Sequence, residues 1–181
     1  MKVKERGEIM IKVQTPVSDD CISKLKIGDQ IEITGIIYTG RDAILPKLAK
    51  LSQEDPEKIK IDLKGGVIFH TAVSPAGIGP TSSNKLEIEG NMDPLSEKGI
   101  KIHLGKGALT KETIQVLDKH NAIFAITPPV TALLTAKILS KEVAMFPEEG
   151  IEALHKLEVT AFPAIVAIAH GESIFDKSGG M

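Results

Sequence analysis

Five polar side chains suited to binding a small anion fall in three short, glycine-containing segments. Arg41 and Lys106 each follow a glycine directly, and Thr81, Ser82 and Lys85 share a third segment. Guanidinium, ammonium, hydroxyl and backbone N–H groups are the donors that proteins use to hold carboxylates and phosphates. The residue types therefore predict a cationic binding site for a small anion.

The longest of these segments, residues 69–85, reads FHTAVSPAGIGPTSSNK and follows the apolar run GGVIF. Glycines at 77 and 79 allow close approach of the backbone to a bound group and unusual dihedral angles. We interpret this segment as a ligand-holding loop at a strand end, where ligands of α/β proteins commonly bind.

Arg41 stands out because arginine occurs only at positions 6 and 41, while the other basic residues are lysines. The planar guanidinium suits bidentate recognition of a carboxylate or phosphate, which a lysine cannot provide. An exposed arginine in a surface ion pair is the other interpretation of the same residue. Composition leaves both interpretations open.

Composition limits the class of protein. The chain has 181 residues, 42% of them hydrophobic, and a formal net charge of -2, which fits a single domain over residues 1–181. The balanced charge and single tyrosine provide no basic field or stacking surface for nucleic acid. No secretory signal or membrane-spanning run is present, so we expect a cytoplasmic protein without membrane or nucleic-acid partners.

The single cysteine, Cys21, excludes an internal disulfide and a thiolate metal site built by this chain alone. We predict a buried structural thiol on a short helix. The five histidines show no metal-binding spacing. His70, at the end of GGVIF, is interpreted either as an acid or base facing the ligand loop or as a hydrogen-bonded structural residue. Dinucleotide, phosphate-loop and nucleophilic-serine motifs are incomplete or missing.

The candidate residues lie at the ends of predicted strands. Alternating or apolar runs predict the strands at residues 9–13, 31–38, 65–69, 85–90 and 100–105, with a bulge at Gly35. A helix is expected after Ser18, which can cap it, and another after Arg41, where leucine and isoleucine recur at helical spacing.

Helices and strands alternate in the second half of the chain. The predicted helices span residues 109–121, 130–139 and 148–157, and the predicted strands span 122–126, 141–146 and 162–171. Thr110 is the expected N-cap of the first of these helices. The pattern predicts an α/β fold in which helices cover sheet layers.

Four segments, in chain order, resemble a known family: TGRDA at 39–43, GPTSSNKLE at 79–87, GKGAL at 105–109 and LHKLEVTAFPAIVAIAHGES at 154–173. The chain resembles the β subunit, or C-terminal domain, of class I fumarases and L(+)-tartrate dehydratases over nearly its whole length. The resemblance implies a swivelling β/β/α three-layer domain. It also implies a hydro-lyase that works with an α subunit, which would hold the 4Fe-4S cluster and use it as a Lewis acid.

The resemblance also implies roles for the candidate residues. Arg41 and Lys106 would bind substrate carboxylates, Thr81 would donate a further hydrogen bond, and Ser82 would take part in proton transfer. Ser82 stands where the family usually has threonine and Lys85 where it usually has arginine. Leu45 stands where the family commonly has histidine.

Two functions remain open from the sequence. The first is the β subunit of a dehydratase acting on malate and fumarate, tartrate or another hydroxy acid, in a hetero-oligomer with its α subunit or as a homodimer when isolated. The second is a non-catalytic module that binds small anions or serves regulation. The first function is the expected one, and the departures at Lys85 and Leu45 are the reason to keep the second as an alternative.

Overall fold

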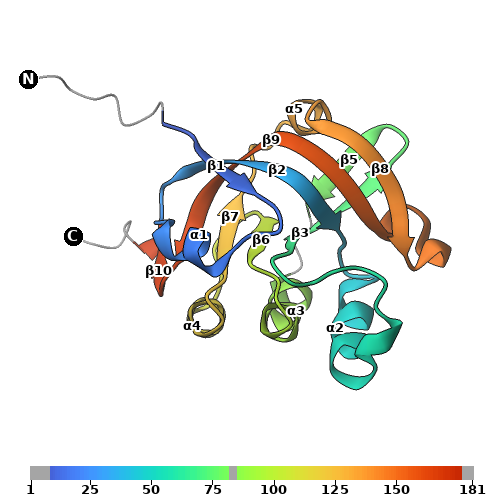
Figure 1. Ribbon diagram of the computed structural model, residues 1–181, viewed down its shortest axis with the longest axis horizontal. Coiled ribbons are helices and arrows are strands. Elements are labelled where there is room, and N and C mark those ends of the chain that lie inside the picture. The colour runs from blue at the N-terminus through green and yellow to red at the C-terminus, as the bar shows by residue number, and fades with distance from the viewer. Residues whose placement is uncertain (1–8, 82–84, 177–181) are drawn as a thin grey trace, which may run out of the picture.

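The computed structural model describes residues 9–81 and 85–176, so Ser82 lies outside the described residues. Thr81 and Lys85 are described by their backbone. The chain forms a mixed α/β protein with two sheet layers and one helix layer (Figure 1), which confirms the predicted fold class. The swivelling motion stays a prediction.

Eight strands form the large sheet and two form a separate hairpin. The sheet contains β1 (Ile11–Gln14), β2 (Gln30–Thr39), β3 (Val67–Phe69), β6 (Ile102–Gly105), β7 (Ile123–Ile126), β8 (Ile138–Met145), β9 (Leu154–Ala169) and β10 (Glu172–Ser173). The hairpin pairs β4 (Thr71–Ser74) with β5 (Gly77–Thr81).

The helices lie mostly on one side of the sheet. They are α1 (Asp19–Lys24), α2 (Leu45–Glu54), α3 (Lys85–Glu97), α4 (Lys111–Lys119) and α5 (Thr131–Thr135), with 3₁₀ helices η1 (Pro56–Lys58) and η2 (Pro147–Glu152). Figure 1 shows α2, α3 and α4 side by side beneath the strands.

The sheet path closes on itself. Strands β1, β2, β3, β6 and β7 are parallel neighbours, and the long strand β9 runs antiparallel to both β7 and β2. The five strands β2, β3, β6, β7 and β9 therefore form a ring, with β8 paired to the free edge of β9. Closing the path in this way gives β3, β6 and β7 a neighbouring strand on both sides and encloses a core.

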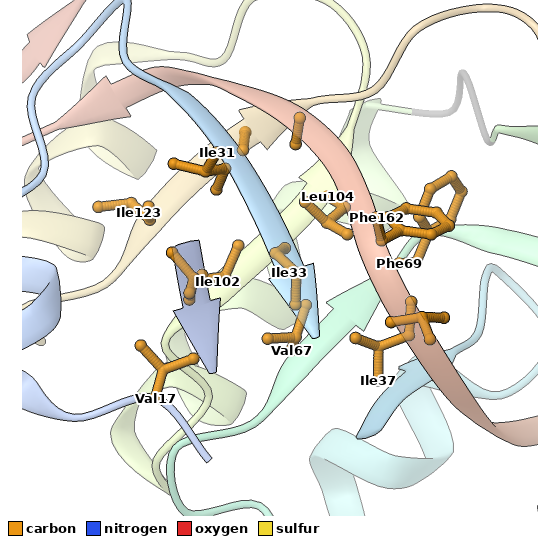
Figure 2. Close-up of a cluster of buried hydrophobic side chains, with 14 of the residues drawn as sticks. Val17, Ile31, Ile33, Ile37, Val67, Phe69, Ile102, Leu104, Ile123 and Phe162 are labelled. Atoms are coloured by element: carbon orange, nitrogen blue, oxygen red, sulfur yellow. The ribbon is translucent and has the colours of Figure 1, made fainter. Parts of the chain in front are cut away.

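The largest hydrophobic core fills the inside of this ring. Figure 2 shows isoleucine, valine, leucine and phenylalanine side chains from β2, β3, β6, β7 and β9 pointing toward one another. Phe69 and Phe162 meet edge to face with ring centroids 5.7 Å apart. Alternation along each strand sends every second side chain into this core, so the register of the strands is fixed by burial.

The opposite faces of the same strands pack on the helices. Leu48 of α2, Leu95 of α3 and Ile68 of β3 belong to a second buried cluster, and Leu117 of α4 packs with Phe124 of β7 in a third. Residues on both faces of β3, β6 and β7 are buried, which explains their continuous apolar sequences.

Several local predictions are confirmed. Ser18 Oγ accepts a hydrogen bond from the N–H of Cys21 at 3.1 Å, and Thr110 Oγ1 accepts one from the N–H of Thr113 at 3.3 Å, so both residues cap helices as expected. The register shifts at Gly35, where Ile33 pairs with Phe162 but Gly35 pairs with residue 159. The extra residue of this bulge lies on β9 rather than on β2.

Two predicted elements have the wrong type. Residues 85–90 were expected to form a strand but begin helix α3, and residues 130–139 were expected to form one helix but split into α5 and the start of β8. Alternation of apolar and charged residues over 85–90 is too short to decide between the two periods. In the second case, residues of β8 pair with the free edge of β9 at six positions. This strand pairing outweighs the helical tendency of the end of segment 130–139.

The predicted helix at residues 148–157 is also wrong. Gly150 adopts φ 60° and ψ -122°, which ends the 3₁₀ helix η2, and β9 begins at Leu154. This strand pairs with β2 and β8 at once, so its backbone groups find partners on both sides. The final predicted strand at 162–171 is therefore the second half of a longer strand.

Candidate functional site

The loops that carry the candidate residues meet at one edge of the sheet. The N–H of Gly40 donates to the carbonyl oxygen of Phe69 at 3.0 Å, and the N–H of His70 donates to that of Leu104 at 3.0 Å. These bonds tie together the carboxyl ends of β2, β3 and β6. Arg41, His70 and Lys106 consequently follow three neighbouring parallel strands, at the edge where α/β proteins bind ligands.

A cavity of about 250 Å³ opens at this edge. Apolar and small residues form most of its wall, and Lys106 is its charged member; the lining residues are Phe69, Ile78, Gly79, Lys106, Thr127, Pro128, Pro129, Thr131 and Leu134. Lys106 is exposed and makes no hydrogen bond or ion pair with any other residue that the structure describes. Its ammonium is therefore available to a ligand in the cavity.

Arg41 lies outside the lining of this cavity. Its carbonyl oxygen accepts hydrogen bonds from the N–H groups of Ile44 and Leu45, both at 3.0 Å, so its backbone forms the turn that leads into α2. Its side chain is 26% exposed, and Nε donates to Glu152 Oε1 at 2.6 Å. The arginine is thus ion-paired and partly buried, and it follows Gly40, which bonds to the cavity residue Phe69.

The segment predicted as a ligand-holding loop is a structured hairpin. Thr71 Oγ1 donates to the carbonyl oxygen of Gly79 at 2.7 Å, and the N–H of Ile78 donates to Thr135 Oγ1 at 3.3 Å. Gly77 has φ +123°, and a Cβ there would lie 2.5 Å from Thr135 Oγ1, so glycine is needed for the approach of α5. The hairpin's contribution to the cavity is Ile78 and Gly79.

Two of the remaining candidates are described by their backbone. Thr81 pairs with Thr71, which directly follows His70, and Lys85 is the first residue of α3. Ser82 lies between them, outside the described residues. The backbone thus places Thr81 beside the carboxyl end of β3, while the roles of Thr81, Ser82 and Lys85 stay predictions.

His70 is fully buried and belongs to a short chain of polar side chains. Its Nε2 lies 3.4 Å from Nδ1 of His103, and Nε2 of His103 lies 2.9 Å from Oγ of Ser96 in α3. Burial lowers the pKa of His70 to about 4 and lowers that of His103 well below its usual value, so both rings are neutral at pH 7. Of the two interpretations of His70, the hydrogen-bonded one describes its contacts.

Among the residues that the structure describes, two buried polar atoms at this edge have no hydrogen-bond partner. They are Nδ1 of His70 and Oγ1 of Thr39, the last residue of β2. Buried polar groups without partners are uncommon and often accompany functional sites. Both atoms lie at the carboxyl ends of neighbouring strands, beside the loops that carry Arg41 and Lys106.

Three features of this edge were not predicted from the sequence. Glu152, the partner of Arg41, lies in a segment predicted to be helical, and no pattern marked it. Ser96 lies in α3, whose first residues were predicted to form a strand, so its contact with His103 was not predicted. The cavity wall at Thr127 and Pro128 could have been found, because a strand that ends in two prolines is a fourth strand-end loop.

The donor set of this chain does not fit an iron-sulfur cluster. Cys21 is partly buried on α1, and burial raises the pKa of its thiol, which disfavours the thiolate form that metals bind. Over residues 9–81 and 85–176, no group of three or more His, Cys, Asp or Glu side chains could hold a metal ion. In the same part of the chain, no helix has the length and apolar character of a membrane-spanning segment.

The fold and the site define an α/β domain with a cationic edge at the carboxyl ends of parallel strands. The sequence matches the Fumarase C-terminus family over residues 1–178. The chain belongs to this family, which confirms the resemblance drawn from its four segments.

Curated relatives include both long and short proteins. A Geobacillus stearothermophilus protein named as a class I fumarate hydratase is 32% identical, over 92% of this chain and 34% of the relative. Proteins named as the beta subunit of L(+)-tartrate dehydratase are 31% identical in Methanocaldococcus jannaschii and 29% identical in Escherichia coli K12, over 86% and 91% of this chain and 86% of each relative. The chain thus spans about a third of the first relative and most of the other two.

Proposed function

We propose that this chain is the β subunit of a hydro-lyase that reversibly dehydrates a small hydroxy dicarboxylate, malate or tartrate. The observation that carries the proposal is the ammonium of Lys106, which has no partner among the described residues and lines a cavity at the carboxyl ends of parallel strands, in a chain of this family. The relatives named as tartrate dehydratase beta subunits, which match this chain over most of their length, support the division into subunits.

The proposed role of Lys106 and Arg41 is to bind the two carboxylates of the substrate. When a proton leaves the carbon beside a carboxylate, negative charge moves onto that carboxylate, and a fixed cation stabilises the transition state. Lys106 is exposed beside the cavity, so its ammonium can meet a carboxylate that enters from solvent. Lys85, at the start of α3, would add a third positive charge.

Ser82 is proposed to carry the proton, and Thr81 to donate a further hydrogen bond to the substrate. A hydroxyl has a high pKa and acts as a base only where cations stabilise its oxyanion, which the lysines of this edge would do. The companion α subunit is proposed to hold a 4Fe-4S cluster, which would supply Lewis-acid chemistry at the substrate hydroxyl. The proposed chemistry of this chain is therefore carboxylate binding and proton transfer.

The experiment is anaerobic co-expression with a cysteine-containing α subunit of the same family, followed by assays with L-malate, fumarate and L-tartrate. We expect turnover of at least one acid by the pair and none by this chain alone. Lys106→Ala should lower kcat/KM about 100-fold because it removes a charge that stabilises the transition state. Its circular dichroism and melting temperature should match the wild type.

Wild-type kinetics for Lys106→Ala would remove the proposed site, and turnover by iron-free chain without a partner would remove the two-subunit account. The alternative is a module that binds dicarboxylates without turning them over. The apolar Leu45, 1% exposed at the start of α2, favours it because this residue brings no acid or base to the edge. Dicarboxylate binding by a chain that never associates with an α subunit would establish that alternative.

A further inference from the structure

We propose that Glu152 is a positioning residue that orients the guanidinium of Arg41 for the substrate carboxylate. The proposal rests on the proposed function and adds a residue 111 positions away in the sequence. The contact is Nε of Arg41 to Oε1 of Glu152 at 2.6 Å, a charge-assisted hydrogen bond between side chains that are 26% and 31% exposed.

The strand ladder brings the two residues together. Thr39 of β2 pairs with His155 of β9 at the last position of the antiparallel register. Arg41 lies two residues after Thr39 and Glu152 lies three residues before His155, so both lie beyond the same end of the ladder. The ion pair therefore extends the β2–β9 ladder by one side-chain contact at the edge that carries the candidate site.

The backbone on each side of the contact is held. The carbonyl oxygen of Arg41 accepts two hydrogen bonds at the start of α2. On the other side, Ala153 and Leu154 are 1% and 0% exposed, and the N–H of Ala153 donates to the carbonyl oxygen of Gly150 at 3.0 Å. A carboxylate carried by such a segment has a defined position, so its hydrogen bond can fix a long and flexible side chain.

A bond at Nε controls orientation more than a bond at a terminal nitrogen would. The guanidinium is planar, so fixing the direction of Nε–H also fixes the plane of the two terminal amino groups. Those amino groups form the fork that recognises a carboxylate bidentately. Glu152 also offsets part of the arginine charge, so its benefit to a bound anion lies in geometry rather than in added attraction.

A second ion pair from the same segment provides a matched control. Lys47 Nζ in α2 lies 2.5 Å from Oε1 of Glu149 in η2, so Glu149 also joins η2 to the α2 region. Lys47 also lies 5.8 Å from the ring centroid of Phe146. If the acids of η2 only hold α2 in place, substitution of either one should have the same consequence.

The test measures steady-state kinetics of the reconstituted pair with whichever dicarboxylate it turns over, for Glu152→Ala, Glu152→Gln and Glu149→Ala. We expect Glu152→Ala to raise KM about tenfold and to change kcat less than about threefold, as for the loss of ground-state binding. Glu152→Gln retains an oxygen that accepts from Nε, so it should keep KM within about twofold of the wild type. Glu149→Ala should leave both constants unchanged.

A double-mutant cycle with Arg41→Lys tests that Glu152 acts through the arginine. Lysine has no Nε–H, so Glu152→Ala should add less than about twofold to the defect of Arg41→Lys. Equal defects for Glu152→Ala and Glu149→Ala, or full additivity in the cycle, would overturn the positioning role. A loss of activity in Arg41→Lys with wild-type Glu152→Ala would overturn it while leaving the proposed function intact, and a wild-type Arg41→Lys would remove both.

Discussion

The two ends of strand β6 carry one lysine each, and their surroundings differ. At the amino end, Lys101 Nζ lies 2.5 Å from Oδ1 of Asp19 and donates to the carbonyl oxygens of His120 and Asn121 at 3.0 and 3.4 Å. Its side chain is 14% exposed, and its hydrogen bond lowers the pKa of Asp19. At the carboxyl end, Lys106 is exposed beside a cavity and has no partner among residues 9–81 and 85–176. One cation serves the fold, and the other is open to a ligand.

Glycines show the same contrast between the two ends. Gly99, which precedes β6, has φ +119°, and a Cβ there would lie 2.7 Å from the Cα of Lys64. Gly107, which follows Lys106, has φ +80° and nothing within 4 Å of an added Cβ. The backbone before β6 is close-packed, and open space at the other end begins only after Lys106, because a Cβ at Gly105 would lie 3.1 Å from the ring of Phe124.

Unsatisfied polar atoms also distinguish the two ends. Thr39 Oγ1 and His70 Nδ1 both lie at carboxyl ends of strands, and no other buried side-chain nitrogen or oxygen of the described residues lacks a partner. Such groups reduce stability because they lose water without gaining a hydrogen bond. These two atoms therefore reduce stability at the edge where the site is proposed.

The largest effect on stability is expected for Gly99→Ala. The positive φ and the close contact with Lys64 should lower the free energy of unfolding by about 3 kcal/mol, measured by urea denaturation. Gly107→Ala is the matched control, with an expected loss of about 1 kcal/mol from φ alone. Similar losses for both variants would remove the contrast in packing between the two ends.

The next effect is a dependence of stability on pH that comes from His70. Its pKa is about 4 in the folded protein and near 6.5 when unfolded, so the unfolded state binds more protons between these values. Stability should therefore fall as the pH is lowered through this range, by about 2 kcal/mol from His70 alone between pH 8 and pH 5.

His70→Gln tests this assignment because its amide keeps a polar atom near the position of the ring Nε2 but does not titrate. Urea denaturation at pH 8 and pH 5 should show a smaller loss of stability for the variant than for the wild type. An unchanged loss would mean that other groups cause the pH dependence.

The smallest effect separates the two lysines. Lys101→Met should lower the free energy of unfolding by about 1.5 kcal/mol because it removes an ion pair and two hydrogen bonds to carbonyl oxygens. Lys106→Met should change it by less than about 0.5 kcal/mol, since no described contact is lost. Thermal and urea unfolding of both variants would contradict the comparison if Lys106→Met were the more damaging substitution.

Local sequence signals predicted much of the fold. Ser18 and Thr110 cap helices as expected, and the parallel strands β3, β6 and β7 follow from uniformly apolar runs. The predicted type of an element was wrong where pairing with a distant strand decided its secondary structure. Residues 138–139 and 154–157 were expected to be helical, but they lie in strands β8 and β9, whose backbone groups pair with neighbouring strands.

Some features of the candidate site were likewise predictable from the sequence, and others were not. The positions of Arg41 and Lys106 at strand ends were readable from the sequence, because a glycine-containing turn follows each apolar run. The pairing of Arg41 with Glu152 was not readable, since it depends on the register of β2 against β9.

The sequence by itself determined the family, the α/β class and the set of cations available for a carboxylate, because these depend on residue types and on short-range patterns. The tertiary structure alone decided that β9 closes the ring, that Lys101 is engaged while Lys106 is open, and that a glutamate 111 residues away holds Arg41. Contacts between distant segments depend on strand register and on the space that packing leaves. Neither can be predicted from a short segment of the sequence.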